Sequence, residues 1–292
     1  MKKKIIIVSI LIVLVIILLL IPRDVYKKIF KKEPTPGNDS PAISQVYQTL
    51  FVKNSNNQLI GIQIPVNAIE EDEIGQKWDL LTSLSSLIPS EYDTPIAKNT
   101  TLFSHEMSNN TLTLNVSTDF LSSEGRIAVE CLAWNFCDDD ISEVVVKVDN
   151  QEVNEVNNFY FDKIDKSMGV NFTFETNYLF EANYFTIVYH ENNTIMPVTY
   201  FYDNSINKMD YMVAKIFGST ENMSDLVSSK AYSYEIKNNK MVINFDYNDT
   251  FSEDLMATIT DTIKQNYIID SFTVNGTQSV LLEEVFYPLE NQ

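Results

Sequence analysis

The sequence predicts an α+β protein in which two similar domains follow an N-terminal transmembrane helix and a Pro-rich linker. Three observations predict it: a 17-residue apolar run near the N-terminus, a proline-rich stretch behind it, and strand, helix and turn patterns that recur after about 130 residues. We expect each domain to be a mostly antiparallel sheet with two helices, in the order ββαββαβ. The predicted segments are a cytoplasmic tail at 1–4, a signal anchor at 5–21, a basic stub and linker at 22–43, a first domain at 44–176 and a second domain at 183–292.

Composition argues against several classes of function. The chain of 292 residues has 40 acidic and 21 basic residues, two Cys, two His and seven Gly. Its net charge of −19 argues against nucleic-acid binding, which needs clustered Lys and Arg. Two Cys cannot build a zinc ribbon or a disulfide scaffold, and the scarcity of Gly and His argues against a phosphate loop or His-based catalysis. The apolar share of 45% is sufficient for a folded core.

The apolar run extends from Ile5 to Ile21, and Ser9 is its only polar residue. At ~1.5 Å per residue a helix of this length reaches roughly 25 Å, just short of a typical ~30 Å hydrocarbon core. No small-x-small cleavage site follows the run, and no lipobox cysteine does. We expect an uncleaved signal anchor, with cleavage at an unusual site as the alternative.

Basic residues flank the apolar run on both sides. Three Lys precede it and five Lys or Arg follow within residues 22–32, so the positive-inside rule slightly favours a cytoplasmic C-terminal side. From Glu33 onward the chain instead has 13 basic and 39 acidic residues, which keeps the body away from anionic head groups. We place the body outside the cytoplasm, on the strength of the family resemblance given below.

The linker, Glu33 to Pro41, has three Pro and one Gly in nine residues and cannot continue a helix. Behind it, each half opens with two strands joined at an Asn-rich turn, at 54–57 in the first half and at 192–193 in the second. The second strands, 59–66 and 194–199, carry the pairs Pro65-Val66 and Pro197-Val198, which are 132 residues apart.

Each half then continues with the same pattern of elements. Apolar residues three and four apart predict a helix in each half; they are Ile74, Trp78, Leu81, Leu84 and Leu87–Ile88 in the first, and Met209, Met212, Val213, Ile216 and Phe217 in the second. Asn109-Asn110 and Asn238-Asn239 precede runs of alternating apolar residues and predict hairpin turns, because Asn tolerates positive φ.

A second helix and a closing strand complete each predicted unit. Ser252 in one half, and Ser122 or Ser123 in the other, are candidate N-caps of that helix. The closing strands are 144–148 and 272–274. The boundary between the two units is expected at 174–183.

These residues resemble a known family. The strand ending Pro-Val, the Leu-rich helix, the hairpin into Leu-x-Leu-Asn-Val-Ser-x-x-Phe, the second helix and the closing Val-x-Val-Asp-Asn are similar to the GerMN domain, the sporulation and spore germination domain that often occurs in tandem. The best local match is 110–120 (Asn-Thr-Leu-Thr-Leu-Asn-Val-Ser-Thr-Asp-Phe), and 191–198 matches the opening strand of a second copy. The resemblance covers most of residues 47–288.

The resemblance implies a secreted or membrane-anchored protein of a Gram-positive bacterium, with its domains outside the cytoplasm. It also implies a fold similar to the ring-building motifs of secretion systems, and hence a role in partner binding or assembly. In spore formers the namesake acts between mother cell and forespore. This sequence lacks the lipobox cysteine of the lipoprotein members, and its second copy is divergent.

Few side chains suggest chemistry. His105 and His190 have no Cys or His partner at metal-ligand spacing, so we interpret both as surface or strand residues. The run 138–140 is three Asp that lack the alternating ligands and the Gly of a calcium loop, and we expect a solvated turn there, with the helix ending before it. Cys131 and Cys137 are six apart, too far for a disulfide within one helix, so we expect small core residues unless a helix break brings them together.

These observations predict a non-enzymatic protein that acts in envelope assembly, sporulation or germination, with no catalytic, cofactor-binding or metal-binding residues and no cofactor. The predicted partners are the membrane, through residues 5–21, and a protein or the cell wall; oligomeric assembly is possible. The alternative is an envelope carbohydrate-binding or hydrolytic protein with an unrecognised site. Aromatic clusters at 159–161 and 184–185 are candidates for a sugar-binding face, although sheet and interdomain packing explains most of the aromatic residues better.

Overall fold

The computed structural model describes residues 46–172, 183–218, 230–247 and 249–286. The predicted tail, signal anchor and linker (1–43) and most of the expected boundary at 174–183 lie outside these residues. Within the described part, no helix has the length and apolarity needed to cross a membrane.

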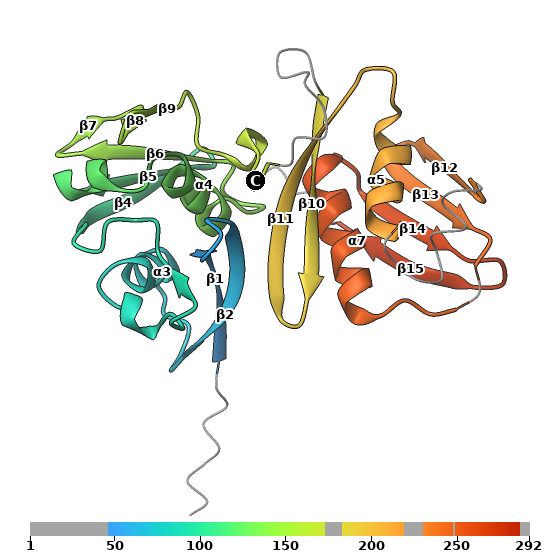
Figure 1. The fold of residues 1–292 in the computed structure, drawn as a ribbon, viewed down its shortest axis with the longest axis horizontal. Coiled ribbons are helices and arrows are strands. Elements are labelled where there is room, and N and C mark those ends of the chain that lie inside the picture. Colours follow the sequence, from blue (N-terminus) through green and yellow to red (C-terminus); the bar gives the residue numbers. More distant parts are fainter. Residues whose placement is uncertain (1–45, 173–182, 219–229, 248, 287–292) are drawn as a thin grey trace, which may run out of the picture. The chain divides into compact units, whose positions relative to one another are not determined.

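The first half consists of short strands and two longer helices (Figure 1). Its strands are β1 (Val46–Asn54), β2 (Leu59–Val66), β3 (Tyr92–Asp93), β4 (Leu102–Ser108), β5 (Thr111–Val116), β6 (Glu143–Val148), β7 (Gln151–Glu152), β8 (Glu155–Val156) and β9 (Phe159–Tyr160). Its helices are α3 (Glu73–Leu81) and α4 (Gly125–Phe136), with 3-10 turns η1 (Ser85–Leu87), η2 (Thr118–Ser122) and η3 (Lys166–Met168).

The second half repeats the pattern of longer elements. They are β10 (Asn183–Glu191), β11 (Thr194–Tyr202), α5 (Lys208–Phe217), β12 (Tyr232–Lys237), β13 (Lys240–Phe245), α7 (Glu253–Asn266), β14 (Ser271–Asn275) and β15 (Val280–Val285). The predicted order ββαββαβ is therefore present in each half. A further strand follows this order directly in each half, β7 in the first and β15 in the second, and β8 and β9 come after β7. The sequence patterns predict none of these strands.

The described strands form two matching four-stranded sheets, one sheet that both halves share, and a two-stranded sheet of β8 and β9. The matching orders are β4-β5-β6-β7 and β12-β13-β14-β15, and in each sheet the two middle strands are parallel while the other pairs are antiparallel. The parallel pairs arise because α4 and α7 each carry the chain across the sheet. The opening hairpins form a separate five-stranded sheet, β10-β11-β2-β1-β3. The prediction of one sheet per domain is wrong in this respect.

The buried residues form two hydrophobic cores, one mainly from each half of the chain. In the second half α5 and α7 lie between the β10–β11 hairpin and the four-stranded sheet (Figure 1). The predicted alternation is confirmed in both four-stranded sheets. Leu112, Leu114 and Val116 of β5 are fully buried, as is Met241 of β13, and Ile243 of β13 is 3% exposed.

The two hairpins meet where β2 pairs with β11 through Gly61 and Ile195. A Cβ atom on Gly61 would lie 2.9 Å from a ring carbon of Phe51 and 3.1 Å from the Cβ of Ile195. Glycine is therefore needed for this approach of the two backbones.

The side chain of Asn171 is a second link between β2 and β11, in addition to the pair of Gly61 and Ile195. Its Oδ1 accepts a hydrogen bond from the Leu59 N–H (2.7 Å), and its Nδ2 donates to the carbonyls of Leu59 (2.7 Å) and Pro197 (2.8 Å). The side-chain amide thus takes the place of a backbone peptide group between β2 and β11.

The first helix is shorter than predicted. It ends at Leu81, where the Thr82 N–H bonds to the Asp79 carbonyl, and the chain turns into η1. Leu84 and Leu87, predicted on the buried face, are 45% and 53% exposed. Ser and Thr compete with the helix for backbone hydrogen bonds, and this segment is rich in both.

The predicted N-cap of the second helix is confirmed in one half and is wrong in the other. Ser252 Oγ accepts from the Leu255 N–H and caps α7, as predicted. The prediction of Ser122 or Ser123 as the cap of α4 is wrong. Glu124 holds that position and makes no capping hydrogen bond with its side chain, and Ser123 Oγ accepts from the Ala97 N–H.

The predicted Asn turns are confirmed, since both residues of 109–110, 192–193 and 238–239 have positive φ. The Pro-Val pairs, in contrast, are not equivalent. Pro65 pairs with Tyr47 far from the turn of its hairpin, whereas Pro197 pairs with Val188 near the turn. Pro65 is exposed and Pro197 is buried.

Candidate functional site

The two histidines lie on strands, as predicted, but on different strands of the repeat. His105 of β4 has Nε2 2.9 Å from Asp72 Oδ1, and His190 of β10 has Nε2 2.7 Å from Asp261 Oδ2. The structure therefore does not bring them together. In the described ranges, no three His, Cys, Asp or Glu side chains are grouped as metal ligands.

The three aspartates after α4 form an exposed turn, as expected. The helix ends at Phe136, and Asp138 Oδ1 accepts hydrogen bonds from the N–H groups of Asp140 and Ile141, both at 2.9 Å. This carboxylate is thus committed to its own loop.

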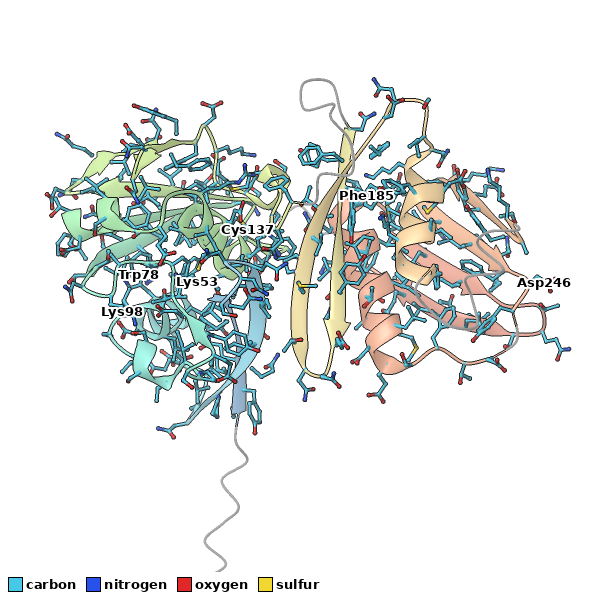
Figure 2. All side chains as sticks on the ribbon, viewed as in Figure 1. Lys53, Trp78, Lys98, Cys137, Phe185 and Asp246 are labelled. Atoms are coloured by element: carbon cyan, nitrogen blue, oxygen red, sulfur yellow. The ribbon has the colours of Figure 1, made fainter. Side chains whose placement is uncertain are left out.

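Both cysteines are free and buried, which confirms their interpretation as core residues. Burial raises the pKa of the Cys137 thiol to about 12 and that of Cys131 further still. Cys137 lies at the end of α4 (Figure 2). Neither thiol is activated as a nucleophile.

The aromatic clusters mostly pack inside the halves. Phe185 is buried, and its ring centroid lies 5.3 to 5.7 Å from those of Tyr200, Tyr202 and Tyr211 (Figure 2). Tyr160 is exposed, but Phe161 beside it is buried. Packing thus accounts for Phe161 and Phe185, whereas Tyr160 and Tyr184 are exposed.

A cavity of about 370 Å³ lies where α4 and η3 face α7. Phe51, Val188 and Ile195 form its apolar wall, and Gln265 also lines it. Its remaining lining residues are Trp134, Asp138, Asp139, Lys166, Asp261 and Lys264.

Most charges in this cavity have partners. Lys264 Nζ lies 2.6 Å from Asp139 Oδ2, and Asp261 is bound by His190. Lys166 differs, because its Nζ lies 5.0 Å from the centroid of the Trp134 ring and no described carboxylate is within ion-pairing distance. Burial lowers the pKa of this lysine, against the opposing effect of the surrounding aspartates.

The outer edge of the five-stranded sheet is closed by side chains of α7. Thr258, Thr262 and Asn266, four residues apart along the helix, accept hydrogen bonds from alternate N–H groups of β10 at 2.9, 3.0 and 3.1 Å. These groups would otherwise be free to pair with another strand.

The outer edges of β4 and β12 are open by comparison. Each is the first strand of its four-stranded sheet, and among the described residues no strand pairs with its outer side. Phe103 and Met107 on β4 are 55% and 43% exposed, and Ile236 on β12 is 45% exposed.

No family model matches the chain, and no curated protein sequence matches it significantly. A solved structure of the tandem GerMN domains of the sporulation protein GerM from Bacillus subtilis superposes with a TM-score of 0.66 at 17% identity, over 81% of this chain and 92% of that one. The chain has the fold of tandem GerMN domains. A structure of the first GerMN domain of the same protein covers 42% of this chain at 16% identity, with a TM-score of 0.38.

The two GerMN-like halves place β4 and β12 at the same position of their sheets, so the open edges are part of the repeated fold. The cavity, in contrast, is built from both halves at once. Sequence reasoning singled out His190 and Asp138 but missed Lys166 and Asp261, which no local motif marks. Their grouping depends on contacts between α4, η3 and α7, which are distant in sequence.

Proposed function

We propose that this chain is a non-enzymatic, membrane-anchored protein whose two GerMN-like domains (44–176 and 183–292) bind a protein partner outside the cytoplasm. The role is in envelope assembly, sporulation or germination. The fold it shares with GerM, a sporulation protein, supports this assignment, and so does the apolar run at 5–21 as an anchor.

The open edges of β4 and β12 carry the proposal of partner binding. An extended segment of a partner adds to such an edge through main-chain hydrogen bonds, while exposed side chains such as Phe103 and Met107 give specificity. By contrast, α7 closes β10 with three side chains. Among the described residues, side chains thus close the edge of β10, whereas the outer sides of β4 and β12 have no strand beside them.

The test is crosslinking in the native envelope, followed by affinity capture of the full chain. We expect captured partners to be lost in the variant Phe103→Lys/Met107→Lys, because charge on an edge opposes strand addition. Tyr160→Lys, at a residue 69% exposed on β9, is the matched control and should capture normally. Equal capture by both variants would contradict binding at β4.

A role in sporulation is tested separately by deleting the gene in its native bacterium. We expect fewer heat-resistant spores, or spores that germinate slowly, with rescue by the intact gene. If the deletion strain forms a normal number of spores and they germinate normally, the protein has no role in sporulation or germination. Envelope assembly is then the remaining role.

The cavity lined by Asp138, Asp139 and Asp261 favours a second candidate, an envelope carbohydrate-binding or hydrolytic protein. That function predicts turnover of purified peptidoglycan by the full chain, abolished in Asp261→Asn. An inactive chain that also fails to bind peptidoglycan would contradict it.

A further inference from the structure

The cavity between α4, η3 and α7 contains a charge that partner binding at the sheet edges does not use. Its volume of about 370 Å³ is within the range of small-molecule sites. Trp134 and Phe51 supply apolar wall, and charged side chains supply the rest.

Lys166 is the group that needs a counter-ion. Its ammonium lies over the Trp134 ring, half-buried, and has no ion-pair partner among the described residues. An ammonium that has lost water without gaining a hydrogen-bonded anion is unfavourable. An anionic group in the cavity would relieve this cost and would also contact the aromatic wall.

The neighbouring carboxylates define the other end of the ligand. Asp139 and Asp261 each use one oxygen, Oδ2, in their ion pairs with Lys264 and His190. A ligand with only negative charge would be repelled by these carboxylates together with Asp138. A ligand that also carries an ammonium group would be attracted by them.

We propose that this cavity binds a small zwitterion, a molecule whose carboxylate pairs with Lys166 and whose ammonium group pairs with Asp261. Free amino acids and the ends of short peptides have this chemistry. The inference is independent of strand addition at β4 and β12, because none of those strands lines the cavity.

The two tryptophans of the chain allow a direct test. The full chain is labelled with 5-fluorotryptophan, and its two fluorine resonances are assigned with the variant Trp78→Phe. Alanine and alanyl-alanine are then titrated as probes. We expect the Trp134 resonance to shift with at least one of them, while that of Trp78, buried elsewhere in the core, stays in place.

Derivatives separate the two charges. N-acetylalanine, which has no ammonium group, and alaninamide, which has no carboxylate, should each bind at least about tenfold more weakly. Tighter binding of alanine would identify the source as a free amino acid, and tighter binding of alanyl-alanine as a peptide. Equal binding of the N-acetylated form would overturn the assignment of a zwitterion.

Variants locate the site. Lys166→Met and Asp261→Asn should each abolish the shift, whereas Lys98→Met, which removes an exposed lysine paired with Asp93, should not. An unchanged Trp78 resonance shows that each variant is folded. No shift with either probe at millimolar concentrations, or an unchanged titration in both cavity variants, would overturn the proposal.

Discussion

Asn135 and Asn266, which are 131 residues apart, make the same three hydrogen bonds in the two halves of the chain. Asn135 Oδ1 accepts from the Phe51 N–H, and its Nδ2 donates to the carbonyls of Phe51 and Cys131. Asn266 does the same with Thr186 and with Thr262. Each side chain therefore satisfies both backbone groups of one residue on the first strand of its hairpin.

The two asparagines have the same role but differ in burial, so we expect their substitution to lower the free energy of unfolding by different amounts. Asn135 is 4% exposed, so Asn135→Ala leaves the Phe51 N–H without a partner and leaves the Phe51 carbonyl with only the Cys131 thiol, at 3.3 Å. We expect a loss of about 2–3 kcal/mol in the free energy of unfolding. Asn266 is partly exposed, so Asn266→Ala should cost about 1 kcal/mol.

Urea unfolding followed by circular dichroism measures both losses. The exposed Asn154, in a loop of the first half, gives the control variant Asn154→Ala, which should lie within about 0.5 kcal/mol of wild type. A loss for Asn135→Ala no larger than that of the control would show that the Phe51 groups find other partners.

Gly61 allows the close contact between the two hairpins, and a larger side chain at this position should destabilise the protein. The variant Gly61→Ala places a methyl group against the Phe51 ring and Ile195, and we expect a loss of about 1–3 kcal/mol from overpacking. Phe51→Leu in the same chain removes part of the obstruction. The double variant should be more stable than the sum of the two single losses predicts, as measured by a double-mutant cycle. Additive losses would mean that the Phe51 ring is not what opposes the added methyl group.

Local features of the fold were predictable from the sequence because neighbouring residues determine them. The alternation of Leu112, Leu114 and Val116 identified β5, and paired Asn residues identified three turns. The end of α3 was missed because Leu84 and Leu87 continue the apolar spacing although the backbone has already turned.

The shared sheet and the cavity were not predictable because they depend on contacts between distant segments. The two hairpins are joined by one strand pair, Gly61 with Ile195, and by the side chain of Asn171, and no periodicity marks these residues. The charged residues of the cavity are likewise ordinary in sequence. Asp261 and Lys264 lie on the exposed side of a regular amphipathic helix, and Lys166 lies in a 3-10 turn.

The buried thiols predict low chemical reactivity in the folded protein. With a pKa of about 12, only about one Cys137 thiol in ten thousand is ionised at pH 8, and Cys131 is ionised less. We expect no reaction with Ellman's reagent on the timescale of minutes in native buffer. Two thiols per chain should react in denaturant, which serves as the control. Rapid native labelling of either cysteine would show that the α4 region opens.

Asp165 predicts a specific dependence of stability on pH. Burial alone would raise the pKa of this carboxyl, but Lys163 at 2.7 Å and two hydrogen bonds from Ser167 lower it below its usual value of 3.8. Because the folded pKa is lower than the unfolded one, the contribution of Asp165 to stability is fully present above pH 3.8 and is lost as the pH falls through the folded pKa.

We therefore expect Asp165→Asn to lower the free energy of unfolding by about 1 kcal/mol at pH 7, since the ion pair is lost while an acceptor for the Ser167 N–H remains. Urea unfolding at a series of pH values should show this difference shrinking below pH 3.8, as the wild-type carboxylate becomes protonated. Asp162→Asn, at an exposed position three residues away, is the control and should lie within about 0.5 kcal/mol of wild type. A difference that stays constant with pH would mean that Asp165 stabilises η3 through its shape and hydrogen bonds and not through its charge.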